Sequence, residues 1–458
     1  MKYDLVILGG GAAGFAAAMK ANELNKKTLM INDNSDVEVG GTCVNVGCFP
    51  TKHMLYKADL IHKIKSNLFN GITANVKIEY EKIVEEKNKL VEDAREEKYK
   101  KVLSNLENVK FINGKAKFVD NHSIIVNGKR IYGEKFLIAT GSKTFIPPIK
   151  GIEKVNYLTN KTALELKKIP EKLVVIGAGA LGLEFAQMFS RFGSNVIIIE
   201  ASEHIMGGID SDFEKMMNIY FKKEGIKIKR NAKIMEVKEN KIILENDEII
   251  DFDEILLATG RIPNTKDLGL ENTGIKLGKK YEIVVDEYYQ AEKNIWAAGD
   301  VIGNPMLETV AAKEGFLAVN NMFLDEKKKI DYDIIPFAIF TDPQFASVGI
   351  TENEAKKRKI KFKCNFVKIE NLPKAIAIKD TRGAIRIVVD SNETIIGIQL
   401  LSPIAADIIH EATMIVKNKM KINEVIETVH VFPTLSEIIK LGAQDFKRDI
   451  TKMSCCVE

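Results

Sequence analysis

The chain has 458 residues, of which 45% are hydrophobic and 28% are charged, and its formal net charge is +4. This length exceeds what one hydrophobic core usually holds, so we expect roughly two to four domains. The positive charge is spread along the chain, no apolar run is long enough to span a membrane, and no signal or transit peptide is visible, so we expect a cytoplasmic protein that binds neither nucleic acid nor membranes.

The first 31 residues are typical of a strand, a glycine-rich loop, a helix and a second strand. The apolar residues 2–8 end in Gly9-Gly10-Gly11-Ala12-Ala13-Gly14, an alanine-rich segment follows, and residues 28–31 are apolar again. This is the G-x-G-x-x-G fingerprint of dinucleotide binding in the context that it requires. Gly9 permits the tight turn, Gly11 lets the backbone approach a pyrophosphate, and Gly14 permits close packing of the helix on the strand.

The end of the second strand departs from the usual pattern. An acidic residue is expected there to hold a ribose, but Asn32 occupies the position and Asp33 follows it. An asparagine amide can donate to or accept from a ribose hydroxyl. Either residue is therefore a candidate for the ribose contact.

Two cysteines with four residues between them lie in Gly40-Gly41-Thr42-Cys43-Val44-Asn45-Val46-Gly47-Cys48-Phe49-Pro50-Thr51-Lys52. The spacing is too long for a C-x-x-C motif and fits a redox-active disulfide at the start of a helix. Pro50 suits the first helical turn, where its missing N–H group carries no penalty. The helix dipole would favour a thiolate at Cys48, which could exchange electrons with a planar cofactor above it. Two small core residues in a glycine-rich turn are the alternative.

The next hundred residues predict an exposed helix, several short strands and a domain boundary. Residues 79–106 are dense in lysine and glutamate and predict an exposed helix. Short strands are expected after it, closing at Ala139-Thr140-Gly141-Ser142. Pro147 and Pro148 then indicate a boundary near residue 150.

The nucleotide-binding pattern recurs from residue 173. Residues 173–176 predict a strand, Gly177-Ala178-Gly179-Ala180-Leu181-Gly182 repeats the fingerprint, and a helix through Phe192 leads to a strand at 196–199. Here the acid is in place as Glu200. A carboxylate accepts from the ribose 2′-hydroxyl of NAD and repels the 2′-phosphate of NADP, so we expect NADH to be preferred to NADPH. Two such units imply two nucleotides.

Further motifs lie after residue 256. Leu257-Ala258-Thr259-Gly260 repeats the earlier Ala-Thr-Gly, and an apolar strand ends in Gly299-Asp300, whose aspartate could hold a polyol hydroxyl. A plain strand-ending turn is the alternative. From residue 335 the pattern becomes antiparallel, which predicts an α+β third domain. Its expected strands are 337–340, 360–367, 384–389 and 394–401, and its expected helices are 405–417 and 422–429.

These motifs resemble those of the flavin- and pyridine-nucleotide-dependent disulfide oxidoreductases, the superfamily of dihydrolipoamide dehydrogenase and glutathione reductase. The resemblance covers essentially the whole chain and includes Thr341-Asp342-Pro343-Gln344. It implies an α/β fold with two Rossmann-like dinucleotide-binding domains, for FAD and NAD, and a C-terminal α+β dimerisation domain. The expected boundaries are 1–150 with 269–334 for a split FAD-binding domain, 151–268 for the NAD(P)-binding domain and 335–458 for the dimerisation domain. The superfamily is dimeric, so both chains of a homodimer are expected to contribute to each active site.

The sequence places two cysteines side by side near its end, at Cys455 and Cys456. Adjacent Cα atoms lie about 3.8 Å apart across a trans peptide, below the usual disulfide range, so a bridge between them would be strained and easily reduced. Two thiolates on a mobile tail suit the capture of a soft metal ion, and a chance pair in a frayed terminus is the alternative. The pair makes the chain most similar, within the superfamily, to the mercuric reductases.

A second feature favours the same family. In dihydrolipoamide dehydrogenase and glutathione reductase a histidine fills the place of Phe432, pairs with an acid at the place of Glu437, and acts as acid and base in thiol–disulfide exchange. Phenylalanine cannot transfer a proton. Mercuric reductases also lack this histidine, although they commonly have tyrosine there. His430, two positions away, is expected to point elsewhere.

The resemblance implies a mechanism in which NADH reduces FAD and the flavin reduces the Cys43–Cys48 disulfide, with Cys48 nearer the ring. Hg(II), captured by Cys455 and Cys456 of the partner subunit, would move by ligand exchange to Cys43 and Cys48 and leave as Hg(0). Lys52 is expected beside the flavin, balanced by Glu184. The residues expected to serve catalysis are Cys43, Cys48, Cys455, Cys456, Glu437 and Phe432, and the four cysteines among them are the expected metal ligands. Those expected to contact FAD are Gly9, Gly11, Ala13, Gly14, Asn32, Gly41, Thr42, Lys52, Ala116, Gly141 and Asp300. Those expected to contact NAD are Gly177, Gly179, Gly182, Glu184, Glu200 and Gly260.

Three other functions stay open at this point. One is a dithiol–disulfide reductase of the lipoamide type, which Phe432 disfavours. Another is a related flavin reductase that acts on copper or on a small oxidant such as a hypohalous thiocyanate and does not need the tail cysteines. The third is a metal-sequestering flavoprotein, which would need neither the Cys43–Cys48 segment nor the second nucleotide unit. Cys364 fits none of these and is expected to be an inert strand residue.

Overall fold

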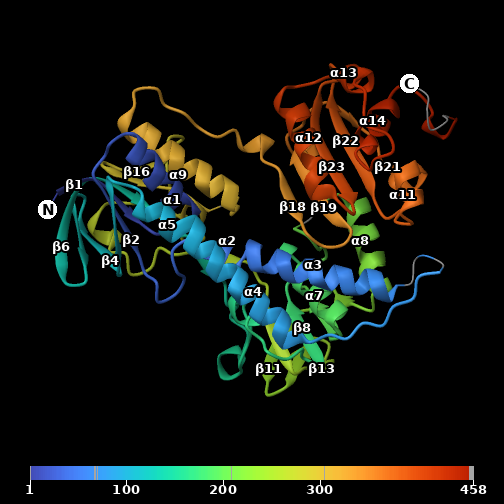
Figure 1. The fold of residues 1–458 in the computed structure, drawn as a ribbon, viewed down its shortest axis with the longest axis horizontal. Coiled ribbons are helices and arrows are strands. Elements are labelled where there is room, and N and C mark those ends of the chain that lie inside the picture. Colours follow the sequence, from blue (N-terminus) through green and yellow to red (C-terminus); the bar gives the residue numbers. More distant parts are fainter. Residues whose placement is uncertain (1, 67–68, 70, 208, 304, 453–458) are drawn as a thin grey trace.

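The computed structural model describes residues 2–66, 69, 71–207, 209–303 and 305–452. Its fold is α/β, with two sheets that have parallel centres and a third sheet that is antiparallel (Figure 1). This confirms the predicted fold class. Among the described residues, no helix combines the length and the apolar character needed to cross a membrane.

The first sheet combines strands from two distant parts of the chain. Its strands are β1 (Lys2–Leu8), β2 (Thr28–Asn32), β3 (Val109–Asn113), β4 (Ala116–Asp120), β5 (Ser123–Val126), β6 (Lys129–Ile138), β16 (Gln290–Glu292) and β17 (Ile295–Ala297). The order is β16-β17-β6-β1-β2-β3, with β4 and β5 paired beside β6. Two helices, α1 (Ala12–Glu23) and α9 (Glu308–Phe323), pack on the face that carries Leu5 and Ile7. The apolar runs predicted at 2–8 and 28–31 therefore form the centre of this sheet.

The second sheet has the order β10-β9-β8-β14 and is parallel throughout. Its strands are β8 (Lys172–Ile176), β9 (Asn195–Ile199), β10 (Lys227–Lys229) and β14 (Glu254–Leu257), and its helices are α7 (Ala180–Phe192) and α8 (Ser211–Lys223). Beside it lie the antiparallel strands β11 (Ile234–Lys238), β12 (Lys241–Leu244) and β13 (Ile249–Asp251). The strands β7 (Ser142–Thr144) and β15 (Arg261–Pro263) pair with each other. β7 follows the last strand of the first sheet before the chain enters the second sheet, and β15 follows the last strand of the second sheet. The helix α6 (Asn160–Ala163) lies between β7 and β15 in sequence.

The third sheet is antiparallel, as predicted, with the order β18-β19-β23-β22-β20 and β21 beside β22. Its strands are β18 (Phe337–Ile339), β19 (Gln344–Gly349), β20 (Phe362–Cys364), β21 (Val367–Lys368), β22 (Ala384–Asp390) and β23 (Ile395–Ser402). Its helices are α10 (Glu352–Lys357), α11 (Pro373–Ala377), α12 (Ala405–Lys417), α13 (Ile422–Glu427) and α14 (Glu437–Gln444). The strand β19 and the helix α14 were not predicted, and the strand expected at 360–367 is divided into β20 and β21.

The lysine- and glutamate-rich stretch forms α4 (Tyr80–Arg95), a π-helical turn at Glu96–Lys100 and α5 (Lys101–Ser104). Most of its charged side chains face solvent, as expected. Lys87 is the exception, because its side chain is 2% exposed and its ammonium lies 2.7 Å from Oε1 of Glu165. The prediction of an exposed helix therefore fails at this residue.

The helix α3 (Cys48–Lys65) connects the three parts of the molecule. It follows the short helix α2 (Gly41–Val46) and runs past α7 beneath the third sheet (Figure 1). Its buried residues Met54, Leu55, Ala58 and Ile61 belong to one hydrophobic core that also contains residues of α7, of α8 and of the third sheet. The element that begins at Cys48 is therefore packed into the centre of the protein.

The contact between α1 and α9 predicts the effect of one added methyl group. A Cβ atom on Gly315 would lie 2.0 Å from the backbone oxygen of Ala13. Gly315→Ala is therefore expected to lower the free energy of unfolding by about 1–3 kcal/mol, the usual range for overpacking, as measured by urea denaturation. Lys313→Ala, on the exposed side of the same helix, is the control and should stay within about 0.5 kcal/mol of the parent. A Gly315→Ala protein as stable as the parent would show that the two helices are not this close.

Candidate active site

Two short elements hold the predicted cysteine pair. Cys43 lies in α2 and Cys48 is the first residue of α3. The turn before them uses Gly40 and Gly41 at φ of +98° and +69°, a conformation that side chains disfavour. The amide of Asn45 donates to three backbone carbonyls of residues 38–41, which fastens the segment onto that turn.

The two thiols differ in their affinity for a proton. Both are free, and the half-buried Cys43 donates a hydrogen bond to the exposed Cys48. This hydrogen bond is the largest of the effects that lower the pKa of Cys48 to about 7. Burial raises this pKa, the Lys52 ammonium lowers it further, and the carboxylates of Glu184 and Glu308 raise it. The same hydrogen bond and burial raise the pKa of Cys43. With a pKa of about 7, Cys48 is divided between thiol and thiolate at neutral pH, whereas Cys43 keeps its proton.

Lys52 and Glu184 form the predicted pair. The Lys52 Nζ lies 2.7 Å from Oε2 of Glu184, whose side chain is 6% exposed. The other carboxylate oxygen of Glu184 accepts from the backbone N–H of Phe340 at 2.9 Å, and the Lys52 ammonium lies 4.4 Å from the centre of the Phe340 ring. One ion pair therefore joins α3, α7 and the segment after β18 beside the dithiol.

The first glycine loop has the shape that a dinucleotide requires. A Cβ atom on Gly9, which has a φ of +119°, would lie 2.0 Å from the backbone oxygen of Ala139, and one on Gly14 would lie 2.0 Å from that of Gly9. Gly11 is different, because a Cβ atom there would meet only the Cα of Gly41, at 3.6 Å. Gly11 precedes α1 and no side chain caps it, so the free N–H groups of the helix can receive a phosphate.

The second glycine loop repeats this geometry. A Cβ atom on Gly177, at a φ of +106°, would lie 2.4 Å from the backbone oxygen of Ala258, and one on Gly182 would lie 2.0 Å from that of Gly177. A Cβ atom on Gly179 would have no neighbour within 4 Å, and Gly179 precedes the uncapped N-terminus of α7. Both loops therefore fit the pyrophosphate of a dinucleotide.

The residues that end the second strand of each unit occupy equivalent places. Oδ1 of Asn32 accepts from the backbone N–H of Gly10 at 2.9 Å, and Oε2 of Glu200 accepts from that of Ala178 at 2.7 Å. Asp33 instead bonds to Ser35. Asn32, rather than Asp33, therefore has the position of the acid in the second unit.

The remaining predicted cofactor residues lie on several elements of the chain. Asp300 accepts a hydrogen bond from Oγ of Ser142, and Nε of Arg261 donates to the same Oγ at 2.7 Å. Gly141 and Gly260 both adopt positive φ just before these two partners. Thr42 lies in α2, Ala13 in α1 and Ala116 at the start of β4.

Sequence reasoning missed three residues that organise this region. Ser142 and Arg261 each follow an Ala-Thr-Gly segment directly, so the repeat could have drawn attention to them. Glu314, which is 3% exposed, accepts from the backbone N–H of Gly299 at 2.7 Å and so supports the turn before Asp300. No local pattern marks Glu314, because its partner is fifteen residues away.

The C-terminal part holds the other predicted catalytic residues away from the dithiol of the same chain. Oε2 of Glu437 accepts from the backbone N–H of Thr434 at 2.9 Å, and α14, which begins at Glu437, lies apart from α2 (Figure 1). Phe432 is 49% exposed. His430 points elsewhere, as expected, with Nε2 at 2.8 Å from Oε1 of Glu411. Cys455 and Cys456 lie outside the described residues.

Cys364 is placed as expected, on the strand β20. It is half-buried, and burial, followed by the nearby Glu352 carboxylate, raises the pKa of its thiol. A thiol that holds its proton is a poor nucleophile.

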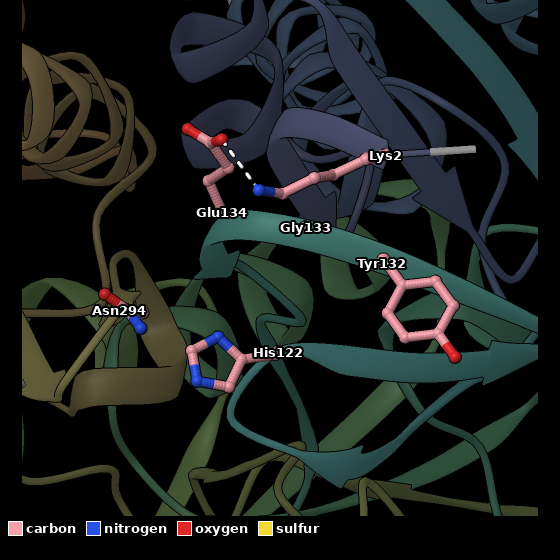
Figure 2. Close-up of a pocket in the computed structure, with 6 residues that line it drawn as sticks. All are labelled: Lys2, His122, Tyr132, Gly133, Glu134 and Asn294. Carbon is pink, nitrogen blue, oxygen red and sulfur yellow. Dashed lines mark ion pairs between the residues drawn. The ribbon is translucent and has the colours of Figure 1, made fainter.

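Two of the hollows on the described part of the protein are compared here with the predicted site. A cleft of about 450 Å³ opens at Ala180, and its walls include Met306, Leu307 and Val348. Ala180 is the first residue of α7, the helix that also carries Glu184. A second hollow, of about 620 Å³, lies at the edge of the first sheet and is crossed by the exposed ion pair of Lys2 and Glu134 at 2.9 Å (Figure 2). Its lining contains none of the predicted site residues.

Comparisons with known proteins agree with this geometry. Residues 3–315 match the model of the pyridine nucleotide-disulphide oxidoreductase family, and residues 335–443 match its dimerisation domain. The mercuric reductase of Lysinibacillus sphaericus is 37% identical over 464 residues, which cover 99% of this chain and 84% of that protein. The mercuric reductase of Streptomyces lividans is 34% identical over 99% of this chain and 98% of its own length.

Solved structures give the same picture. The HOCl-induced flavoprotein disulfide reductase RclA of Escherichia coli has a TM-score of 0.87 and 28% identity over 96% of this chain and 99% of its own. LpdA of Mycobacterium tuberculosis has a TM-score of 0.88 and 25% identity over 98% of this chain and 100% of its own. The chain belongs to the pyridine nucleotide-disulphide oxidoreductase family, as the sequence motifs predicted. It is an oxidoreductase whose family implies FAD and a pyridine nucleotide, and its dimerisation domain indicates a homodimer.

The asymmetry of the thiols predicts how Cys48 reacts. In the reduced protein, alkylation of Cys48 by iodoacetamide should accelerate as the pH rises through about 7, because the thiolate is the reactive form. Lys52→Met should move this midpoint to higher pH, since it removes the ammonium that favours the thiolate. Lys57→Met, on the same helix and paired with Glu86, is the control. The rate can be followed by mass spectrometry of the peptide containing Cys48, and an unshifted midpoint in Lys52→Met would contradict the assignment.

Proposed function

We propose that this chain is a mercuric reductase, which transfers two electrons from NADH to Hg(II) and releases Hg(0), NAD⁺ and a proton. The observation that carries the proposal is the pair of free thiols, in which Cys43 donates a hydrogen bond to Cys48 and lowers its pKa to about 7. Thiolates are the ligands that soft metal ions prefer. The similarity over nearly the full length to proteins named mercuric reductase supports the same substrate.

Each nucleotide-binding unit would serve one cofactor. FAD, when bound to residues 1–150 and 269–334, would relay two electrons between the nicotinamide and the dithiol. The open loop at Gly11 and the N-terminus of α1 would hold its pyrophosphate, and Asn32 its ribose. Residues 151–268 would bind NADH through Gly179 and Glu200, with the cleft at Ala180 as the place of the nicotinamide.

The dithiol would bind Hg(II) after a handover from the tail. The partner's Cys455 and the partner's Cys456 would capture the ion and pass it to Cys43 and Cys48 by exchange of one thiolate for another. Lys52 would favour the thiolate of Cys48 throughout. In this exchange the incoming Cys43 thiol would give up its proton and the departing tail thiolate would take one up, so that no separate acid–base side chain is needed at the place of Phe432.

The loop that carries Phe432 supports a shared site in a dimer. Val429, Val431 and Phe432 are 82%, 76% and 49% exposed in one chain, which is unusual for three apolar side chains so close in sequence. A second copy of the chain would cover them. Residues 335–458 would then complete the active site of the partner.

The first test is NADH oxidation by the purified flavoprotein on addition of Hg(II) with excess thiol. The parent is expected to turn over and to release volatile mercury, and Cys455→Ala/Cys456→Ala should lose most of this activity, because the ion reaches the dithiol through the tail. Cys364→Ala is the matched control and should behave as the parent. Inhibition by Hg(II) with turnover of lipoamide would instead indicate a disulfide reductase. Turnover of Cu(II) or of an oxidant, independent of the tail, would indicate a reductase of that substrate.

The place of Glu200 predicts the coenzyme. The parent is expected to have a higher kcat/KM for NADH than for NADPH, and Glu200→Ser should lower kcat/KM for NADH by about ten-fold or more, since a hydrogen bond to a charged group contributes about 1.5–3 kcal/mol. Discrimination against NADPH should fall with it, because the repelling carboxylate is lost. Glu203→Ser, which removes an exposed carboxylate three residues away, is the control. Equal efficiency of the parent with both coenzymes would refute the preference.

A further inference from the structure

A basic segment, residues 229–233, lies against the loop that follows Glu200. The strands β9 and β10 run parallel, and the backbone N–H of Glu200 donates to the carbonyl of Lys229 at 2.8 Å. The backbone N–H of Asn231 then donates to the carbonyl of Ser202 at 3.0 Å. An α/β sheet binds its ligands at the carboxyl ends of its strands. The basic segment therefore borders the place where Glu200 would meet the ribose of the coenzyme.

The three cations of this segment each pair with a different carboxylate. The pairs are Lys229 with Glu248 at 2.7 Å, Arg230 with Glu214 at 2.6 Å and Lys233 with Glu245 at 3.3 Å. Guanidinium and ammonium groups are the side chains that bind phosphates, and an arginine near the ribose accommodates the 2′-phosphate of NADP. The three carboxylates therefore oppose an attraction for NADPH that the basic segment would otherwise exert.

The pair of Arg230 and Glu214 belongs to the loop itself. The side chain of Glu214, on α8, is 5% exposed and that of Arg230 is 28% exposed. Oε1 of Glu214 also accepts from the backbone N–H of Ile205 at 3.3 Å, and its Oε2 lies 3.0 Å from Nδ1 of His204. Nη1 of Arg230 lies 3.5 Å from the backbone oxygen of Glu203. One buried carboxylate thus holds both the guanidinium and the loop.

The same contacts connect Glu214 to Glu200. Oε1 of Glu200 accepts from the backbone N–H of Ser202 at 2.9 Å. Oγ of Ser202 lies 2.9 Å from that carboxylate oxygen and 2.7 Å from the backbone oxygen of His204, whose ring contacts Glu214. A chain of polar contacts therefore runs from the predicted ribose ligand to Arg230. Its last member, Glu214, keeps the guanidinium engaged at a fixed place beside the ribose site.

We propose that Glu214 and Arg230 are specificity-determining residues for the coenzyme: Glu214 sequesters the guanidinium, so that a 2′-phosphate meets only the carboxylate of Glu200. The inference rests on the proposed binding of NADH by residues 151–268. The two carboxylates act in the same direction, because one repels the phosphate and the other withholds the cation that would attract it. In Glu214→Gln the amide oxygen can still accept from the N–H of Ile205, but the charge that holds Arg230 is lost. The guanidinium is then available to a phosphate bound next to it.

The test measures binding rather than turnover, so that a failure of the Hg(II) proposal does not affect it. Adenosine 2′,5′-bisphosphate and adenosine 5′-monophosphate are titrated into the FAD-loaded dimer by calorimetry, and the two Kd values are compared. Glu214→Gln should lower the Kd of the bisphosphate about three- to ten-fold and leave that of the monophosphate within about two-fold, because only the bisphosphate carries the group that Arg230 can bind. Adding Arg230→Gln to Glu214→Gln should abolish this gain, and Arg230→Gln alone should bind both compounds as the parent does.

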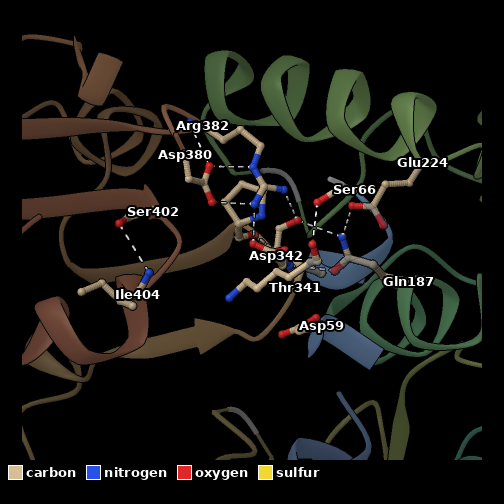
Figure 3. Close-up of polar contacts among 12 residues, drawn as sticks. Asp59, Ser66, Gln187, Glu224, Thr341, Asp342, Asp380, Arg382, Ser402 and Ile404 are labelled. Atoms are coloured by element: carbon tan, nitrogen blue, oxygen red, sulfur yellow. Dashed lines mark hydrogen bonds and ion pairs between the residues drawn. The ribbon is translucent and has the colours of Figure 1, made fainter. Parts of the chain in front are cut away.

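A matched control separates release of the guanidinium from a general change in net charge. Asp380 pairs with Arg382 at 2.7 Å in a cluster beside the third sheet (Figure 3), so Asp380→Asn removes one carboxylate from a guanidinium outside the loop of Glu200. This variant should keep both parental Kd values.

Two outcomes would overturn the inference, and they differ in what they leave standing. If Glu200→Ser does not weaken binding of the monophosphate, the proposed coenzyme site is wrong and the inference fails with it. If Glu200→Ser does weaken it, the coenzyme site stands. The inference alone then fails if Glu214→Gln gives no gain for the bisphosphate, if the gain survives loss of Arg230, or if Asp380→Asn gives the same gain.

Discussion

The structure depends on one buried carboxylate that needs a positively charged partner. Glu184 lies in the second nucleotide-binding unit with its side chain 6% exposed, and removal of its partner would leave an uncompensated charge in a poorly solvated place. Lys52 supplies the partner from α3, and the backbone of Phe340 supplies a hydrogen bond from the third sheet. The helix that begins at Cys48 is therefore held against the helix that begins after Gly179. The dithiol and the second glycine loop have a fixed relation for this reason, although they are far apart in sequence.

The two nucleotide-binding units have the same backbone and differ in charge. The glycines that must pack closely do so in both loops, where an added Cβ atom would lie 2.0–2.4 Å from a backbone oxygen, and the glycine that must leave room does so in both. The difference lies at the end of the second strand, where one unit has the neutral Asn32 and the other the anionic Glu200, each accepting from the glycine loop. A neutral amide tolerates a neighbouring phosphate better than a carboxylate does, so the first unit is the less selective of the two. Selection between nucleotides by charge therefore belongs to the second unit.

The sequence predicted those parts of the fold and the site that depend on neighbours in the chain. The apolar runs, the glycine spacings and the helix after Cys48 are local patterns, and each was found at the expected residues. The Lys52–Glu184 pair was expected only through the family resemblance. The Asp59–Arg191 ion pair, the buried Lys87 and the support of Gly299 by Glu314 were not expected at all, because each joins residues that only the folded chain brings together. The strand β19 was missed since its small residues give weak β propensity, and its place is set by β18 and β23 on either side.

The proposed substrate, a metal ion, differs from a disulfide substrate in its need for a proton donor. When a thiolate attacks a disulfide, the departing sulfur takes a negative charge, and a nearby acid that can protonate it speeds the reaction. Here the position that would supply this acid in a partner subunit is Phe432, in an apolar and exposed loop. In the proposed reaction, Hg(II) bound by Cys43 and Cys48 would leave as Hg(0) while the two sulfurs close to the disulfide, so both electrons would come from the sulfurs and no thiolate would depart. Phe432 has no proton to give, and this proposed reaction would not require one from it.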